Sequence, residues 1–112
     1  MATRVVIVDY GSGNLRSVAK AFERAAREDK RDIDLEISTH ADDIANADRI
    51  VLPGVGAFAA CHAGLAALPG MIEALENAVI NKARPFLGIC VGMQLMATFG
   101  EERGIHRGLG WI

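Results

Sequence analysis

Short apolar segments separated by amphipathic stretches set the pattern of this chain. Residues 5–8, 50–52 and 86–89 form three apolar runs that are continuous rather than alternating. Runs of this length and kind are typical of strands that are covered on both faces, as in a parallel sheet. Leu35 and Ile37 alternate with polar neighbours, so they predict a fourth strand that is more exposed.

Helical spacing fills the intervals between these runs. Apolar residues recur at i, i+3, i+4, i+7 and i+11 between positions 15 and 26, which gives one apolar stripe. A second stripe spans positions 68–79 with Pro69 near its start, and residues 91–99 predict a third helix that ends at Gly100. The expected order is strand, helix, strand, short helix, strand, two helices, strand, helix. Right-handed crossovers turn this order into a three-layer, doubly wound, mostly parallel α/β sheet.

Composition narrows the class of protein without identifying it. The 112 residues suffice for one domain with a modest core, and the net charge of −2 comes without a basic block or an acidic tail. No apolar run approaches the roughly 18 residues that cross a bilayer, and the first residues do not resemble a signal peptide. With two cysteines, Cys61 and Cys90, the chain is not a disulfide scaffold. We therefore expect a cytoplasmic protein with no nucleic-acid or membrane partner.

The last two residues lead us to expect that the sequence is part of a longer protein. Trp111 and Ile112 are apolar and follow a glycine-rich stretch, so they predict the beginning of another strand. A sheet that ended there would leave an open edge and an uncovered apolar face, which proteins normally avoid.

The most specific motif is the segment Gly-Ile-Cys-Val-Gly at positions 88–92, where a predicted strand ends and a helix begins. Its spacing is that of the nucleophile elbow, with Cys90 in the place of serine. In such a turn the flanking glycines make room, and the helix N-terminus favours the reactive thiolate. The N–H of Val91 would then donate to a developing oxyanion. The alternative is a buried structural cysteine between two packing glycines.

A second motif follows the neighbouring strand, at Pro53, Gly54, Val55 and Gly56. Small residues there let backbone N–H groups approach a carboxylate, a phosphate or an oxyanion. Taken alone, the motif is weak, and it is more often an ordinary turn between a strand and a helix. In a parallel sheet both turns would share the edge where ligands bind, so we expect this loop to lie beside Cys90.

Together these stretches resemble the class I (triad-type) glutamine amidotransferases. The resemblance rests on residues 52–58 and 85–95, with a further match at 108–110, and the opening at 8–18 is similar to the glutaminase subunits of imidazole glycerol phosphate synthase. It covers essentially the whole chain but only about the N-terminal half of the family's domain. It therefore implies that residues 1–112 are the N-terminal part of a single amidotransferase domain with a flavodoxin-like fold.

The resemblance also implies roles for particular residues. Cys90 would attack the side-chain amide of L-glutamine and form a glutamyl thioester. The backbone of residues 54–56 and the Val91 N–H would hold the glutamine and its tetrahedral oxyanion, and Gln94 would help to hold the glutamine. No metal and no organic cofactor is implied.

The resemblance further implies a partner. Released ammonia would pass to a (βα)8-barrel cyclase subunit, which forms a heterodimer with the glutaminase and makes imidazole glycerol phosphate in histidine biosynthesis. The turn at Gly13 and Asn14 would lie near that partner.

The general base of the family, a histidine oriented by a glutamate, falls outside this sequence. His40 is predicted in a solvated turn and His106 in a charged loop, while His62 is adjacent to Cys61, and neighbouring residues of a helix do not face each other. A base must reach hydrogen-bonding distance of its nucleophile, so none of the three is a convincing substitute. We expect this chain alone to be inactive.

Two other interpretations stay open at this point. The same chemistry could serve a different nitrogen-requiring synthase. Alternatively, the chain could be a non-catalytic flavodoxin-like module in which the turn at 11–13 holds a phosphate at a helix N-terminus and Cys90 is inert packing.

Overall fold

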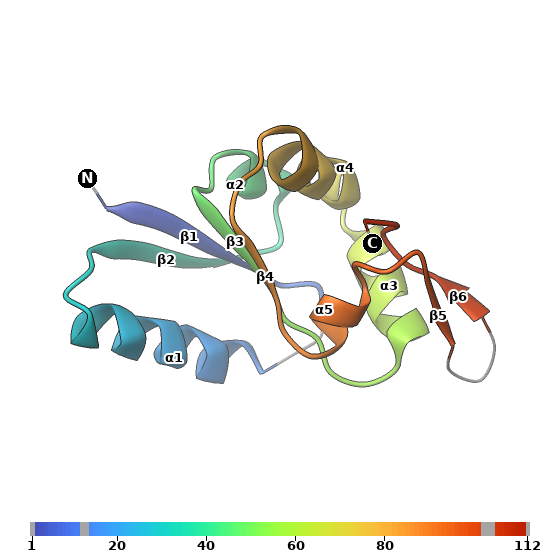
Figure 1. Cartoon of the computed structure of the whole chain (residues 1–112), viewed down its shortest axis with the longest axis horizontal. Helices are drawn as coiled ribbons and strands as arrows, with labels where there is room; N and C mark the ends of the chain where they lie inside the picture. Colours follow the sequence, from blue (N-terminus) through green and yellow to red (C-terminus); the bar gives the residue numbers. More distant parts are fainter. Residues whose placement is uncertain (1, 12–13, 102–104, 112) are drawn as a thin grey trace.

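A four-stranded parallel sheet organises the molecule (Figure 1). The structure is a computed structural model, and it describes residues 2–11, 14–101 and 105–111. The strands are β1 (Thr3–Val8), β2 (Ile33–Ser38), β3 (Arg49–Leu52) and β4 (Phe86–Gly88), in the spatial order β2-β1-β3-β4. All three pairings are parallel, so the carboxyl ends of the four strands lie at one edge of the sheet.

Helices cover both faces of this sheet, so the predicted three-layer α/β architecture is confirmed. They are α1 (Leu15–Glu28), α2 (Ala41–Ala45), α3 (Phe58–Ala67), α4 (Met71–Glu76) with its π-helical continuation η1 (Asn77–Asn81), and α5 (Val91–Gln94). Figure 1 shows α1 beneath the sheet and α2 and α4 above it. The alternation of strands and helices along the chain produces this arrangement because each crossover returns to the same sheet.

The two faces of β1 explain its continuous apolar sequence. Val6 and Val8 pack into the core beneath α2, α3, α4 and α5, whereas Val5 and Ile7 pack against the residues of α1 on the opposite face. All four side chains are buried. A strand that is buried on both faces cannot carry alternating polar residues, so its sequence is apolar throughout.

The prediction of a helix over residues 91–99 is wrong beyond its first turn. α5 ends at Gln94, and Phe99 and Gly100 lie in a strand, β5 (Phe99–Glu101), which pairs antiparallel with β6 (Ile105–Arg107). The segment after β6 accounts for the early end of the helix. The N–H groups of residues 109–111 donate to the carbonyls of residues 95–97 at 2.8–3.0 Å. In a longer helix these carbonyls would have accepted hydrogen bonds from the following turn, so the returning segment takes the place of that turn.

Trp111 is not assigned to a strand and Ile112 lies outside the described residues, so the strand expected to begin here stays a prediction. The indole ring packs edge-on against Phe86, with the two ring centroids 5.1 Å apart. Trp111 thus contributes to the core beside β4 through its side chain rather than through sheet pairing.

The apolar stripe at positions 68–79 is helical only from residue 71. Gly70 has a left-handed backbone, with φ at 69°, and separates α3 from α4. No single helix among the described residues is long and apolar enough to cross a membrane, and α3 with residues 71–81 reaches that length only as a pair bent by 96°. Leu65 and Met71, on either side of the bend, are fully buried in the protein core.

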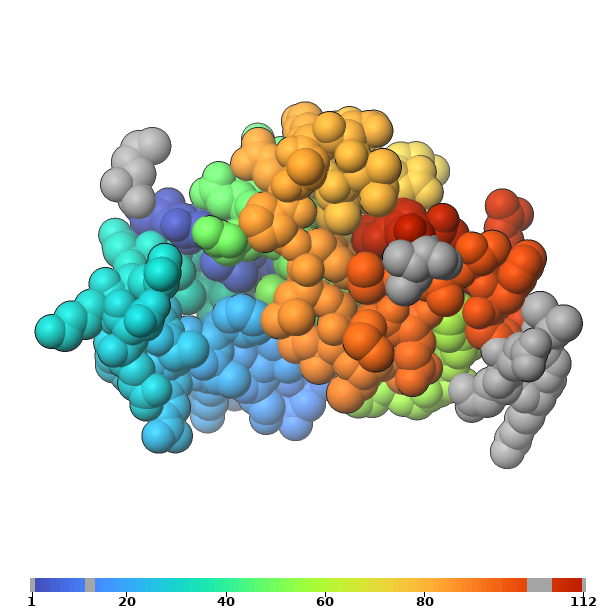
Figure 2. All heavy atoms as spheres, viewed as in Figure 1, coloured from blue at the N-terminus to red at the C-terminus, as the bar shows by residue number. Residues whose placement is uncertain are grey.

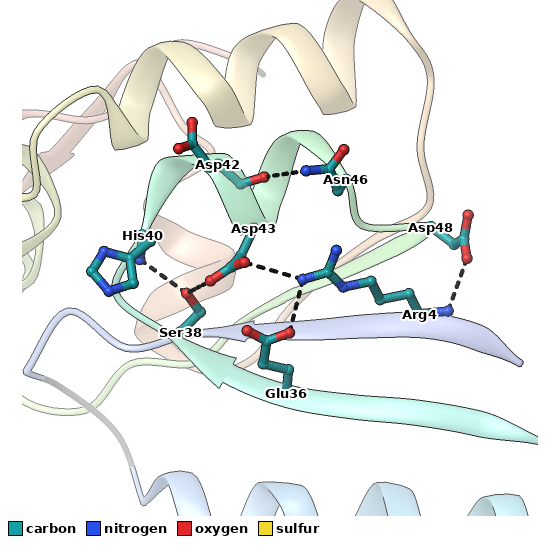
Figure 3. A network of polar contacts seen from close by, with 8 residues as sticks. All are labelled: Arg4, Glu36, Ser38, His40, Asp42, Asp43, Asn46 and Asp48. Atoms are coloured by element: carbon teal, nitrogen blue, oxygen red, sulfur yellow. Dashed lines mark hydrogen bonds and ion pairs between the residues drawn. The ribbon is translucent and has the colours of Figure 1, made fainter.

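A polar network joins β1, β2 and α2 on the upper face of the sheet (Figure 3). The Arg4 guanidinium contacts the Glu36 carboxylate at 2.8 Å and the Asp43 carboxylate at 3.1 Å. The Ser38 hydroxyl donates to the other oxygen of Asp43. The Ser38 hydroxyl contributes most to holding the pKa of Asp43 below its ordinary value of 3.8, and Glu36 and the Arg4 guanidinium lower it further.

This network predicts an acid-sensitive contribution to stability. Because the pKa of Asp43 is lower in the folded protein than in the unfolded chain, its stabilising effect is complete above the unfolded value and is lost as the pH falls through the folded value. Asp43→Asn should therefore lower the melting temperature at pH 7, and the loss should shrink as the pH falls progressively below 3.8. Thermal unfolding at pH 7 and at an acid pH below 3.8 measures this. Asp34→Asn, at an exposed position of the same strand pair, should change neither; an equal loss at both pH values would contradict the assignment.

Candidate active site

The carboxyl ends of β3 and β4 bring the two sequence motifs together. The Ile89 N–H donates to the Leu52 carbonyl at 3.0 Å, and the Val91 N–H donates to the Gly54 carbonyl at 3.2 Å. The segment that carries β4 and α5 lies on the molecular surface, seen in orange in Figure 2. The cysteine turn and the loop at 53–56 are thus hydrogen-bonded neighbours at the edge where parallel sheets bind ligands.

Cys90 lies at a sharp corner between β4 and α5. Its backbone has φ 55° and ψ −122°, and its side chain is exposed. A non-glycine residue with such angles costs about 1–3 kcal/mol and persists only where the surroundings impose it. An inert packing cysteine would need neither the strain nor the exposure, so the geometry favours the nucleophile-elbow interpretation over the packing interpretation.

Gly88 and Gly92 impose this corner by letting three backbone segments approach closely. A Cβ at Gly88 would lie 2.7 Å from the Met93 Cα, and a Cβ at Gly92 would lie 1.8 Å from the Leu52 carbonyl oxygen. The sequence motif suggested that the two glycines make room around Cys90 itself. In the structure, the close approaches are instead between β4 and α5, at Gly88, and between α5 and β3, at Gly92. The glycines are required because α5 folds directly onto the sheet.

Three consecutive carbonyls of the loop at 53–56 each accept a hydrogen bond from a different part of the molecule. The donors are the Tyr10 hydroxyl to Pro53, the Val91 N–H to Gly54 at 3.2 Å, and the Cys61 thiol to Val55 at 3.2 Å. The sequence motifs identified neither Tyr10 nor Cys61 as part of this site. Their roles depend on contacts between distant elements, and the one available signal was their position, directly after β1 and one turn into α3.

The other residues that the sequence analysis assigned to the site or to the partner interface are Gln94, Gly13 and Asn14. Gln94 is exposed at the end of α5, and its backbone N–H donates to the Cys90 carbonyl at 3.3 Å. Asn14 caps α1, because its side-chain oxygen accepts the Ser17 N–H at 3.4 Å. Gly13 lies outside the described residues. Asn14 thus has a structural role whether or not it also contacts a partner.

Among the described residues, the Cys90 thiol has no hydrogen bond to a histidine. The His40 ring points away from the polar network, and only its backbone N–H contacts Ser38 (Figure 3). His62 is half-buried on α3. His106 is in β6 and half-buried, not in a charged loop as expected, because the hairpin orders this stretch. The described part of the chain also contains no group of three potential metal-ligating side chains.

Comparison with known proteins identifies the family of this chain. The family model described as glutamine amidotransferase class-I matches residues 6–106. The chain is 64% identical over 109 residues to the imidazole glycerol phosphate synthase subunit HisH of Agrobacterium fabrum, covering 97% of this chain and 50% of that protein. The proteins of the same name from Brucella suis and Rhodospirillum rubrum are 62% and 57% identical, over 97% of this chain and 50% and 51% of their own lengths.

The chain spans about half the length of the curated relatives it matches. The family model nevertheless extends over nearly all of its residues, including the loop at 53–56 and the cysteine turn at 88–92. The chain belongs to the class-I glutamine amidotransferase family.

Proposed function

We propose that this chain supplies the nucleophile and the oxyanion loop of a glutaminase that delivers ammonia to a synthase. The observation that carries the proposal is the exposed Cys90 thiol on a strained elbow, hydrogen-bonded through Val91 to the loop at 53–56. The relatives named imidazole glycerol phosphate synthase subunit support ammonia delivery to a cyclase that makes imidazole glycerol phosphate in histidine biosynthesis. We infer a cytoplasmic heterodimer with a (βα)8-barrel cyclase.

The reaction divides into two steps at the sulfur of Cys90. The thiolate attacks the side-chain amide carbon of glutamine, a C–S bond forms, and the carbonyl oxygen becomes an oxyanion. The C–N bond then breaks, and the nitrogen leaves as ammonia after it takes a proton from a general acid. Water next attacks the thioester with help from a general base, releases glutamate and restores the thiol. The resemblance assigns both proton transfers to a histidine outside this sequence.

The oxyanion step requires a change in the loop. The Val91 N–H is the donor next to the nucleophile, but it is engaged by the Gly54 carbonyl. Because the C=O and N–H of a trans peptide point in opposite directions, rotation of the Gly54–Val55 peptide would release Val91 and turn the Val55 N–H toward the same side. Two donors would then face the developing charge, which is the arrangement that stabilises a tetrahedral oxyanion. Partner or substrate binding would drive this rotation.

Two further assignments follow from the same proposal. Gln94, exposed one turn after the nucleophile, would hold bound glutamine through its side-chain amide. The turn at Gly13 and Asn14, which follows β1 at the same edge of the sheet, would contact the cyclase. Neither assignment requires a metal or an organic cofactor.

Glutamine turnover by the intact protein tests the proposal. With the cyclase subunit present, glutamate release from L-glutamine should be at least roughly tenfold faster than without it, since the Val91 donor must first be freed. The measurement is glutamate formed per minute, with asparagine as the control substrate. No glutamate release with any synthase partner would contradict the proposal. Stimulation by a different synthase, and not by the cyclase, would move the ammonia to another acceptor.

A further inference from the structure

Cys61 makes a contact that the proposed chemistry does not use. It lies on the first turns of α3, its side chain is 2% exposed, and its thiol donates to the Val55 carbonyl at 3.2 Å. Its backbone N–H donates to the Ala57 carbonyl at 3.1 Å, so the residue is also held by its own helix. α3 in turn is fixed in the core by Phe58 and Leu65, which are 3% and 0% exposed. The thiol is therefore a donor on a rigid support.

The three carbonyls of the loop at 53–56 accept hydrogen bonds from two kinds of donor, buried side chains and the backbone of the elbow. Pro53 is held by the Tyr10 hydroxyl and Val55 by the Cys61 thiol, and both donors belong to buried side chains. The middle carbonyl, that of Gly54, is held only by the Val91 N–H among the described residues. The two outer peptides of the loop are thus anchored to the core, and the middle peptide is anchored to the elbow itself.

We propose that Cys61 is a positioning residue for glutamine hydrolysis, which fixes the Val55–Gly56 peptide so that rearrangement of the loop is confined to the Gly54–Val55 peptide. The inference rests on the proposed glutaminase function. A planar trans peptide held at its carbonyl also has the direction of its N–H fixed, so the thiol sets the direction of the Gly56 N–H. Gly56 has φ at 91° and no atom within 4 Å of the position of a Cβ, so packing at Gly56 does not restrict the peptide. Cys61 supplies a constraint from the buried core.

Substitutions at Cys61 distinguish the role of its thiol as a hydrogen-bond donor from its role in filling space in the core. Cys61→Val replaces the thiol by a somewhat larger, branched apolar group that has no donor, whereas Cys61→Ser places an O–H donor at the γ position of the thiol. Each variant is made in the intact protein and assayed with its synthase partner. Four quantities are measured: kcat and KM for L-glutamine, the rate of iodoacetamide alkylation at Cys90, and the melting temperature. Alkylation needs the thiolate but no oxyanion donor, so it reports on the elbow alone.

We expect Cys61→Val to lower kcat by roughly tenfold to a hundredfold, because small displacements of catalytic donors have effects of this size. KM should rise less than kcat falls, because glutamine is also held outside this peptide, by Gln94 in the proposed site. The rate of Cys90 alkylation should change less than about twofold, since alkylation needs no oxyanion donor. Cys61→Ser should keep kcat within about threefold of the unsubstituted protein, because the hydroxyl replaces the donor. If Cys61→Val does not fold, Cys61→Ala removes the donor without a branched side chain, and the same results are expected of it.

Three results would overturn the inference. An unchanged kcat in Cys61→Val, with glutamine turnover normal in the unsubstituted protein, would refute the role of Cys61 and leave the proposed function intact. Equal losses of kcat in the valine and serine variants, in step with their melting temperatures, would assign Cys61 to packing alone. No glutamine turnover in the unsubstituted protein with its partner would refute the proposed function and this inference together.

Discussion

Replacing Cys90 by serine is expected to lower kcat/KM for glutamine hydrolysis by at least about a thousandfold, as removal of a nucleophile does in other covalent hydrolases. A serine hydroxyl is almost fully protonated at neutral pH and is a far weaker nucleophile than a thiolate. The backbone, with φ of 55° at this position, should not change, because serine differs from cysteine in a single side-chain atom. The measurement is glutamate release by the intact protein with its partner, beside a melting curve that confirms folding.

Two controls make this result specific. Cys61→Ser introduces the same chemical change at the other cysteine and should leave turnover within about threefold. Cys90→Gly removes the nucleophile and also relieves the positive φ, so it should be inactive and about 1 kcal/mol more stable. An inactive but more stable variant indicates that the strain at the elbow is kept for reactivity. Residual activity within tenfold in Cys90→Ser would show that another residue attacks the amide.

Local patterns were sufficient to predict the sheet and the elbow. Residues 5–8 and 50–52 are apolar on both faces because helices pack on both faces of the sheet, and this requirement is visible in single-residue hydrophobicity. The elbow was visible because Gly88 and Gly92 satisfy steric demands of adjacent backbone at a fixed spacing. Features of this kind depend on neighbours in the sequence or on simple burial.

Contacts between distant segments could not be predicted in the same way. Phe99 continues a plausible helical pattern that Gly100 would end, yet both residues form a strand because backbone from residues 108–111 takes the carbonyls that a longer helix needs. From the sequence, Tyr10 is an aromatic residue in a turn and Cys61 is a cysteine on a helix. Only their tertiary contacts show that both lie against the loop at 53–56. The sequence also gave no sign that the Gly54 carbonyl occupies the Val91 N–H.

Gly92→Ala is expected to destabilise the intact protein by roughly 3 kcal/mol, the upper range for forcing an extra carbon into a packed interior. The new Cβ would lie 1.8 Å from the Leu52 carbonyl oxygen and 2.8 Å from its carbon. Leu52 cannot withdraw easily, because its carbonyl accepts the Ile89 N–H and its strand pairs with β4. In an exposed helix the same substitution stabilises by about 1 kcal/mol, so the sign of the change is itself informative. Urea unfolding measures it.

Gly110→Ala separates this clash from the general cost of adding a side chain to a glycine. Gly110 has φ at 76° and no atom within 4 Å of the position of a new Cβ, so the cost there should be only about 1 kcal/mol, from the left-handed backbone. In Gly92→Ala, relief of the clash would move α5 away from β3 and break the bond between Val91 and Gly54, so glutamine turnover should fall even in molecules that stay folded. Equal stability losses at the two glycines, or full turnover in Gly92→Ala, would show that α5 can move away from β3 without disturbing the nucleophile. The close packing of α5 on β3 would then not be what holds Cys90 in its reactive conformation.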